Sequence, residues 1–190
     1  MEAAFVAGAA RLDRLPPPRL PEVAFAGRSN VGKSSLLNTV VSRRALARVS
    51  KTPGRTQQIN FFSVDERLLL VDLPGYGFAR VPLAVKDAWR GLVEGYLTAP
   101  RPLRGVFVLV DVRRGLAADD VQLLEFLDAH DIATRVVATK LDKLTRGLRA
   151  AALAGMADAA GTAAIGFSVK ERLGAAALWQ QIDGWVGKKN

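Results

Sequence analysis

The stretch GRSNVGKSS, residues 27–35, carries the residue types that hold phosphate groups. It fits the pattern G-x-x-x-x-G-K-S from Gly27 to Ser34, and it lies between an apolar run at 23–26 and Leu36 and Leu37, which continue a helical pattern. In this context the backbone amides and the helix N-terminus cradle phosphate oxygens. The sequence therefore predicts a phosphate-binding loop made of Gly27, Arg28, Ser29, Asn30, Val31, Gly32, Lys33, Ser34 and Ser35.

A second stretch, LLLVDLPGYG at 68–77, supplies a partner for this loop. Lys33 is expected to reach the β- and γ-phosphates, and the Ser34 hydroxyl to bind Mg²⁺, which Asp72 at the end of an apolar strand holds through water. Gly75 is expected to offer its amide to the γ-phosphate, since a residue without Cβ lets the chain approach closely. A plain turn explains Pro74 and Gly75 equally well in isolation. The order of the motifs favours a site that includes Asp72, Leu73, Pro74 and Gly75.

The stretch TKLD, residues 139–142, is short, but as the third motif in this order it predicts a site that distinguishes guanine from adenine. A carboxylate at Asp142 can accept hydrogen bonds from N1–H and the 2-amino group of guanine, whereas adenine leaves it unpaired, a mismatch that costs roughly 10⁴ in selectivity. The Lys140 stem is expected to lie along the base, and the later stretch FSVK at 167–170 to close over it. The predicted base site is thus Thr139, Lys140, Leu141, Asp142, Phe167, Ser168 and Val169. An ATP-using P-loop kinase stays as an alternative.

These motifs need an α/β scaffold. Apolar runs alternate with amphipathic stretches, which is typical of a mainly parallel sheet with helices on both faces. We expect six strands, near 22–26, 59–64, 67–72, 105–111, 134–139 and 162–167. Helices are expected near 32–41, 82–98, 118–129, 145–160 and 171–187. Residues 1–20 are predicted to form an N-terminal extension with a proline-rich lead-in, and residues 21–190 one domain.

Composition narrows the partners and the location. The chain has no cysteine and one histidine, which excludes disulfides, thiolate zinc sites and multi-histidine metal sites. No apolar stretch is long enough for a transmembrane helix, and no export signal is evident, so we expect a cytoplasmic protein. The formal net charge of +9 favours a polyanion such as RNA, although an anionic membrane surface or a merely solvated basic face remains open. An acid-free basic run at 41–55 contains Arg43, Arg44, Arg48, Lys51 and Arg55.

Together GRSNVGKSS, GRTQQINFF, DLPGYGFA, TKLDKL and FSVK resemble the EngB (YihA/YsxC) family of bacterial ribosome-biogenesis GTP-binding proteins, within the TrmE-Era-EngA-EngB-Septin-like GTPase superfamily. The resemblance runs from about Pro21 to Trp185 and includes LVDVRRGLAADDVQLLEFL. It implies a three-layer P-loop GTPase fold, or G domain. It also implies that Thr56 joins Mg²⁺ in the GTP state, with Thr52 as a rival, and that Lys33, Thr56 and Gly75 serve catalysis. The implied switch segment is Gly54, Arg55, Thr56, Gln57 and Gln58.

The role implied by this resemblance is assembly of the large ribosomal subunit, with a link to normal cell division and septation. Our leading hypothesis is a monomeric GTPase switch that binds rRNA or a large-subunit precursor. The alternative is a nucleotide-gated RNA-binding assembly factor for which GTP or GDP is a structural ligand. Slow intrinsic hydrolysis is expected because Tyr76 stands where many GTPases place a water-orienting glutamine. Asn30 is a candidate K⁺ ligand or, alternatively, a brace for the loop.

Overall fold

The computed structural model describes residues 2–41, 58–77 and 83–187 of the chain. The basic run from Arg43 to Arg55, the rival Thr52 and the switch residues from Gly54 to Gln57 lie outside the described residues. The strands are β1 (Ala3–Ala9), β2 (Glu22–Gly27), β3 (Ile59–Val64), β4 (Leu68–Asp72), β5 (Leu103–Asp111), β6 (Thr134–Thr139) and β7 (Ala164–Gly166). The α-helices are α1 (Lys33–Val40), α2 (Leu83–Thr98), α3 (Ala118–Ala129), α4 (Arg146–Ala160) and α5 (Ala175–Val186). Short 3₁₀ turns occur at Leu12–Arg14 and Leu141–Lys143.

One sheet organises these elements, in the strand order β1-β3-β4-β2-β5-β6-β7. Strands β4, β2, β5, β6 and β7 run parallel to one another, and β3 is antiparallel to both β1 and β4. All six residues of β2, EVAFAG, are buried. A strand in a parallel sheet is covered by helices on both faces, so its sequence is a nearly continuous apolar run and does not alternate between polar and apolar residues. The predicted α/β fold class is confirmed, with one strand more than expected.

The additional strand is β1, which comes from the segment that we expected to be an extension. Its backbone pairs with β3 from Ala3 opposite Val64 to Ala9 opposite Ile59, with an irregularity between Phe5 and Ala7. Alanine and glycine dominate AAFVAGA, so neither propensity nor alternation predicts a strand. Pairing at the sheet edge depends on the backbone of β3, which the local sequence of β1 does not encode.

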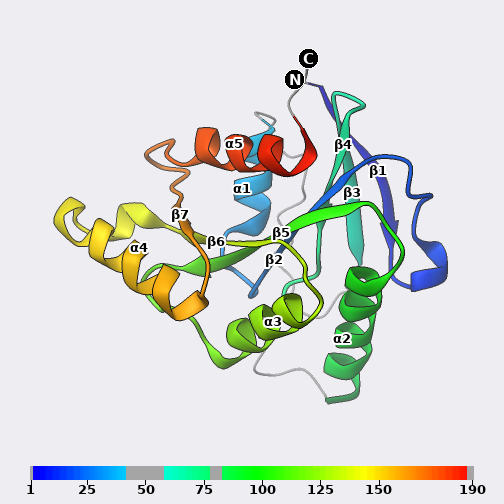
Figure 1. Ribbon diagram of the computed structural model, residues 1–190, viewed down its shortest axis with the longest axis horizontal. Coiled ribbons are helices and arrows are strands. Elements are labelled where there is room, and N and C mark those ends of the chain that lie inside the picture. Colours follow the sequence, from blue (N-terminus) through cyan, green and yellow to red (C-terminus); the bar gives the residue numbers. More distant parts are fainter. Residues whose placement is uncertain (1, 42–57, 78–82, 188–190) are drawn as a thin grey trace.

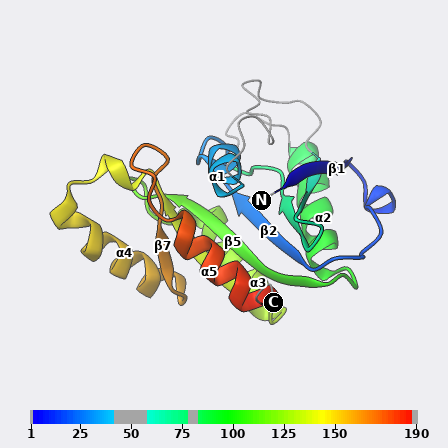
Figure 2. The same cartoon turned by 90° about the horizontal axis from the view of Figure 1, so that it is seen from above.

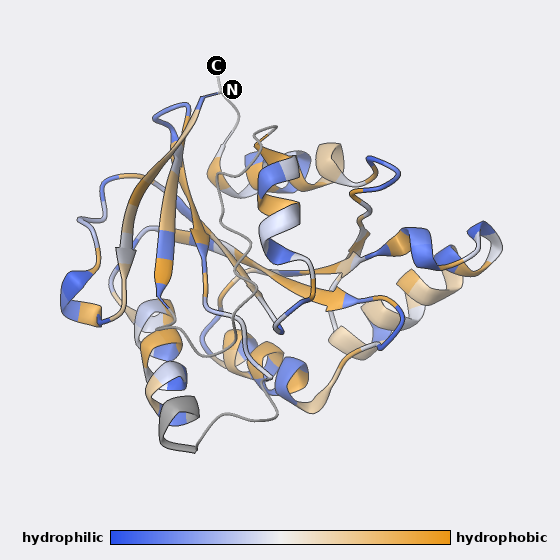
Figure 3. Cartoon of the chain, turned by 180° about the vertical axis from the view of Figure 1, so that it is seen from behind, coloured by the Kyte–Doolittle hydropathy of each residue, from blue (hydrophilic) through white to orange (hydrophobic). Residues whose placement is uncertain are grey.

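Two hydrophobic layers cover the sheet. One layer packs buried residues of α2, α3 and α4 against one face, and the other packs α1 and α5 against the opposite face. Figures 1 and 2 show this division, and in Figure 3 the central strands are coloured as mostly hydrophobic. Because β2, β4, β5 and β6 run in the same direction, their carboxyl ends meet at one edge of the sheet. All predicted motifs that follow these strands therefore gather at that edge.

Candidate functional site

The predicted phosphate loop connects the end of β2 with the first turn of α1 (Figure 1). Gly32 has a φ of 105°, in the left-handed region that favours glycine, and the helix begins at the next residue, Lys33. Asn30 also has a positive φ, of 63°. At Gly27 an added Cβ would lie 3.0 Å from the Leu109 backbone oxygen and from a methyl group of Val31, so a side chain there would push the loop off β5.

The loop after β4 lies against this phosphate loop. The Ser29 amide donates to the Tyr76 backbone oxygen at 2.9 Å, and the Tyr76 amide donates to the Gly27 oxygen at 3.3 Å. An added Cβ at Gly75 would lie 3.3 Å from the Ser29 nitrogen, so the absence of a side chain permits this approach. The Lys33 ammonium pairs with the Asp72 carboxylate, and each side chain is only 11% exposed. The strand-end aspartate is thereby brought to the first turn of α1, which also carries Ser34.

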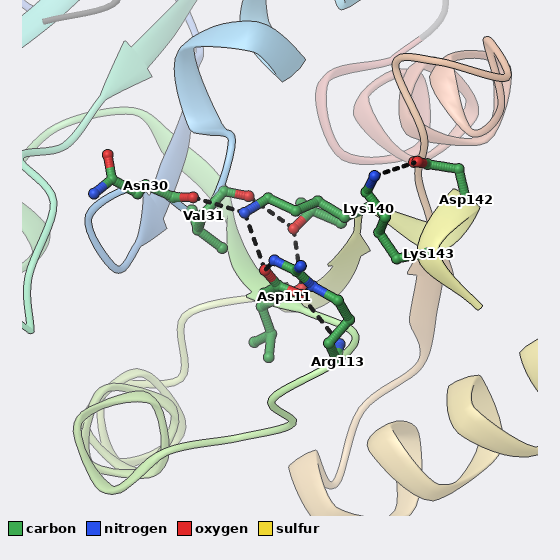
Figure 4. A network of polar contacts seen from close by, with 9 residues as sticks. Asn30, Val31, Asp111, Arg113, Lys140, Asp142 and Lys143 are labelled. Atoms are coloured by element: carbon green, nitrogen blue, oxygen red, sulfur yellow. Dashed lines mark hydrogen bonds and ion pairs between the residues drawn. The ribbon is translucent and has the colours of Figure 1, made fainter. Parts of the chain in front are cut away.

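The TKLD segment reaches the phosphate loop from the other side. Thr139 ends β6, and its hydroxyl donates to the Val31 backbone oxygen at 2.8 Å. The Lys140 ammonium donates to the Asn30 backbone oxygen at 2.9 Å (Figure 4). Lys140 itself has a φ of 60°, a left-handed conformation that ends the strand and starts the 3₁₀ turn. The base motif and the phosphate motif are thus in direct contact.

The FSVK segment completes a pocket beside these contacts. The Leu141 amide donates to the Phe167 oxygen at 3.0 Å, and the buried Ser168 hydroxyl donates to Asp142 Oδ1 at 2.7 Å. This hydrogen bond holds the pKa of the Asp142 carboxyl below its usual value. A cavity of about 300 Å³ opens here, lined by Val31, Gly32, Ser35, Thr139, Lys140, Asp142, Phe167, Val169 and Lys170. An ionised carboxylate at the wall of an otherwise largely apolar pocket can accept paired N–H donors of a base.

The comparisons with known proteins agree with this geometry. The profile described as "50S ribosome-binding GTPase" matches residues 22–140. The "Probable GTP-binding protein EngB" of Geotalea daltonii is 54% identical over 76% of this chain and 70% of its own length. The protein of the same name in Syntrophotalea carbinolica is 47% identical over 95% of this chain and 89% of its own length. The chain belongs to the EngB family of GTP-binding proteins.

Solved structures support the G-domain fold of this EngB-family chain. A crystal structure of a probable GTP-binding protein engB has a TM-score of 0.72 at 24% identity and covers 88% of this chain and 100% of its own. A variant of Aquifex aeolicus Era bound to GDP.AlF4- has a TM-score of 0.71 at 18% identity, covering 90% of this chain and 58% of its own. Family membership makes the protein a GTP-binding GTPase, which sets aside the ATP-using kinase. No helix among the described residues is long and apolar enough to span a membrane.

Two predicted positions have environments that the sequence did not suggest. Tyr76 is buried, and its hydroxyl donates to Asp120 Oδ1 on α3 at 2.7 Å, so its side chain turns away from the phosphate loop. Burial first, and the Asp120 carboxylate second, raise the pKa of Tyr76 well above its usual value. Gln58 is exposed just before β3, where its amide donates to Asn60 at 2.9 Å.

The sequence analysis missed polar residues that support the base motif of this EngB-family site. Asp111 ends β5 and forms an ion pair with Lys140 at 3.0 Å, while Arg113 binds the same carboxylate (Figure 4). Lys170 lines the pocket but was not among the predicted site residues. A signal for Asp111 was available, because an aspartate that ends an apolar strand is the pattern that singled out Asp72.

Proposed function

We propose that this EngB-family protein is a GTPase switch whose GTP form docks on a precursor of the large ribosomal subunit and whose hydrolysis releases it. The observation that carries the proposal is the convergence of three motifs on one loop. Ser29 contacts the loop after β4, Lys33 contacts Asp72, and Lys140 contacts Asn30. A nucleotide bound to this loop would therefore contact Lys33 with its phosphates and Lys140 with its base.

Within this proposal the amides from Gly27 to Ser35 hold the phosphates, and Lys33 exchanges its Asp72 partner for phosphate oxygens. Asp142 accepts the guanine N1–H and 2-amino hydrogens. Ser168 keeps Asp142 ionised and aimed, and the Lys140 stem flanks the base. Gly75 gives its amide to the γ-phosphate. Leu73, Pro74, Thr139, Leu141, Phe167 and Val169 shape the same site. Thr56, which we propose as a further residue of the site, lies outside the described residues.

The residues present fit Mg²⁺. Ser34 and Asp72 supply the hydroxyl and carboxylate oxygens that this ion prefers, and the contact between Lys33 and Asp72 brings the two to one place. Within 2–41, 58–77 and 83–187, no group of three or more acidic, histidine or cysteine side chains forms a metal cage. Mg²⁺ commonly keeps several waters and binds with substrate phosphates. Ser34 and Asp72, with Thr56 as the resemblance implies, would hold the ion, and it would supply positive charge against the phosphates.

Two observations support the proposal of a ribosomal partner. The matching profile is described as belonging to 50S ribosome-binding GTPases, and the sequence carries a net charge of +9. The basic run from Arg43 to Arg55 follows α1 in the sequence, close to the proposed switch, where lysine and arginine contacts to rRNA phosphates would depend on salt. We place the protein in the cytoplasm as a monomer that contributes to subunit assembly and, through it, to cell division and septation.

Co-sedimentation with purified large subunits tests the switch. We expect association to be stronger with a non-hydrolysable GTP analogue than with GDP or without nucleotide, and to fall as salt rises. Binding that ignores both nucleotide and salt would contradict the switch. Binding that needs nucleotide but is the same for GTP and GDP would favour the assembly factor in which the nucleotide is a structural ligand.

Slow intrinsic hydrolysis is part of the proposal. The Tyr76 side chain is engaged with α3, so it offers no group to orient the attacking water. The exposed Asn30 amide is free for a K⁺ ion, since among the described residues its side chain has no hydrogen-bond partner and only its backbone oxygen braces the loop. A cation there would offset charge developing between the β- and γ-phosphates.

Phosphate release in matched K⁺ and Na⁺ buffers, with and without large subunits, tests this part. We expect acceleration by K⁺, by the subunit or by both, and we expect Asn30→Ala to lose the K⁺ effect while keeping GDP affinity. No acceleration under any of these conditions would remove both ideas. A fast wild-type rate in Na⁺ alone would mean that another group performs catalysis.

A further inference from the structure

The carboxylate of Asp111 lies at the centre of the polar network in Figure 4. Its position is set by the sheet, because Asp111 is the last residue of β5 and pairs in register with Thr139, the residue before Lys140. Asp111 is 7% exposed, so its carboxylate is buried beside Lys140, which lines the pocket. The carboxylate therefore faces the ammonium group of the base motif from a rigid element.

Asp111 accepts hydrogen bonds from two cations at once. Arg113 donates from Nε to Oδ1 at 3.0 Å and from Nη2 to Oδ2 at 2.7 Å, and its backbone amide adds a third bond to Oδ1 at 3.1 Å. Lys140 lies 3.0 Å from Oδ2. The hydrogen bond from Arg113, more than any other contact, holds the pKa of Asp111 well below its usual range, so the carboxylate is ionised at neutral pH.

The same Lys140 ammonium donates to the Asn30 backbone oxygen at 2.9 Å. Lys140 thus spans from the end of β5 to the phosphate loop, across the wall of the pocket. Among the described residues the Lys140 ammonium has no other hydrogen-bond or ion-pair partner, and an unanchored lysine would sample many rotamers. Two partners at 2.9 and 3.0 Å restrict the stem to one path before a base arrives.

We propose that Asp111 is a positioning residue for guanine nucleotide binding, which acts by anchoring Lys140 between the base pocket and the phosphate loop. Arg113 fixes the Asp111 carboxylate but is not itself the anchor, because its side chain is 46% exposed and is directed to Asp111. This inference rests on the proposed function, in which Lys140 flanks the base. It assigns a role in nucleotide binding to a residue outside the phosphate loop, the DLPG turn, TKLD and FSVK.

A double-mutant cycle on GDP affinity tests the anchor, with Lys140→Ala, Asp111→Asn and the combination of both. Asn keeps the size of the side chain and one acceptor oxygen for Arg113, but it removes the charge that holds Lys140. We expect Asp111→Asn to weaken GDP binding about tenfold, in line with loss of a charged hydrogen bond. The double variant should be no weaker than Lys140→Ala alone, since Asp111 acts only through Lys140.

Two further variants separate the anchor from a merely structural effect. Asp183→Asn removes a comparable ion pair, to Arg67 at 2.7 Å, away from the pocket, and should leave GDP affinity unchanged. Arg113→Ala removes the side chain that fixes the Asp111 carboxylate, so it should weaken GDP binding, but less than Asp111→Asn does, because the charged partner of Lys140 at 3.0 Å remains. Circular dichroism checks folding of each variant. If Asp111→Asn does not fold, Asp111→Ser, whose hydroxyl still accepts from the Arg113 amide, enters the same cycle.

The outcomes distinguish this inference from the function on which it rests. If Lys140→Ala leaves GDP affinity unchanged, the proposed base site is wrong. If Lys140→Ala weakens binding but Asp111→Asn does not, only the anchor is wrong. Additive losses in the double variant would also overturn the anchor, because they would mean that Asp111 affects binding by a route other than Lys140.

Discussion

A buried carboxylate lies at each end of strand β5, but its partners are buried at one end and partly exposed at the other. At its start Leu103 pairs with Glu22, whose carboxylate is fully buried and accepts from Tyr96 at 2.8 Å and from Arg101 Nη2 at 2.5 Å. At its other end Asp111 binds Arg113 and Lys140, whose side chains are 46% and 31% exposed. The first network is closed, since the Arg101 side chain is only 6% exposed, and the second opens onto the pocket.

The difference separates the use of charge for folding from its use for binding. Around Glu22 every partner comes from the core or its border, and Arg101 also lies over the Phe61 and Tyr96 rings and donates to the Pro16 oxygen. No ligand can reach this carboxylate. At the other end Lys33 pairs with Asp72 where, in our proposal, phosphate oxygens take over, and Lys140 stays anchored to Asp111 and to the Asn30 oxygen beside the pocket. We interpret the buried ion pair at the amino ends of the strands as structural, and we propose that the pairs at the carboxyl ends belong to the nucleotide site.

The largest effect is expected from breaking the closed network. Arg101→Ala leaves the buried Glu22 charge with Tyr96 as its one remaining side-chain partner among the described residues, so we expect a loss of about 3–5 kcal/mol in unfolding free energy. Urea denaturation measures it. Arg113→Ala is the matched arginine removal at the open end and should destabilise the chain far less, because that side chain is half-exposed and solvent screens its charge. Equal losses for the two variants would contradict the distinction.

The next effect concerns Lys33 at the open end. Lys33→Ala removes the expected phosphate contact, so we expect affinity for GTP and GDP to fall between about tenfold and a hundredfold, the worth of a charged hydrogen bond. The chain should stay folded, because Lys33 is on a loop-to-helix junction outside the core. Fluorescent-nucleotide titration with circular dichroism checks both. Global unfolding of Lys33→Ala would mean that the Lys33–Asp72 ion pair stabilises the fold.

The sequence predicts the local motifs of the site but not the long-range ion pairs at either end of β5. The phosphate loop, the DLPG turn and TKLD were predictable because each depends on a local pattern that follows an apolar strand. The meeting of these motifs was also predictable, since parallel strands bring their carboxyl ends to one edge. The pairings of Asp111 with Lys140 and of Glu22 with Arg101 join residues from separate elements, and no local pattern predicts which charge meets which.

Strand β1 and Tyr76 show two further limits of local patterns. The sequence of β1 is mostly alanine, and its strand conformation is imposed by the edge of β3. From the sequence, Tyr76 indicates only that a water-orienting glutamine is missing, whereas in the structure its side chain has a partner on α3. The identity of Asp120 as that partner depends on how α3 packs on the sheet, which spacing alone does not give.

A smaller effect is expected for Tyr76→Phe. This change removes the hydroxyl that donates to the buried Asp120, while the Ala117 amide still donates to that carboxylate at 2.8 Å. We expect a loss of about 1–2 kcal/mol in unfolding free energy, with nucleotide affinity and the GTP hydrolysis rate unchanged. Thermal unfolding and phosphate release measure these. An altered hydrolysis rate would mean that the Tyr76 hydroxyl takes part in the reaction and does not serve only to stabilise the fold.

The central claim is that the open end of the sheet binds guanine through Asp142, and titration of Asp142→Asn with GDP and xanthosine diphosphate tests it most directly. Asparagine can donate to the xanthine 2-oxo group but cannot accept both guanine hydrogens as the carboxylate does. We expect GDP affinity to fall at least about a hundredfold and xanthosine diphosphate affinity to rise above that of the wild type. Unchanged GDP affinity, with no gain for xanthine, would contradict the account and remove Asp142 from the base site.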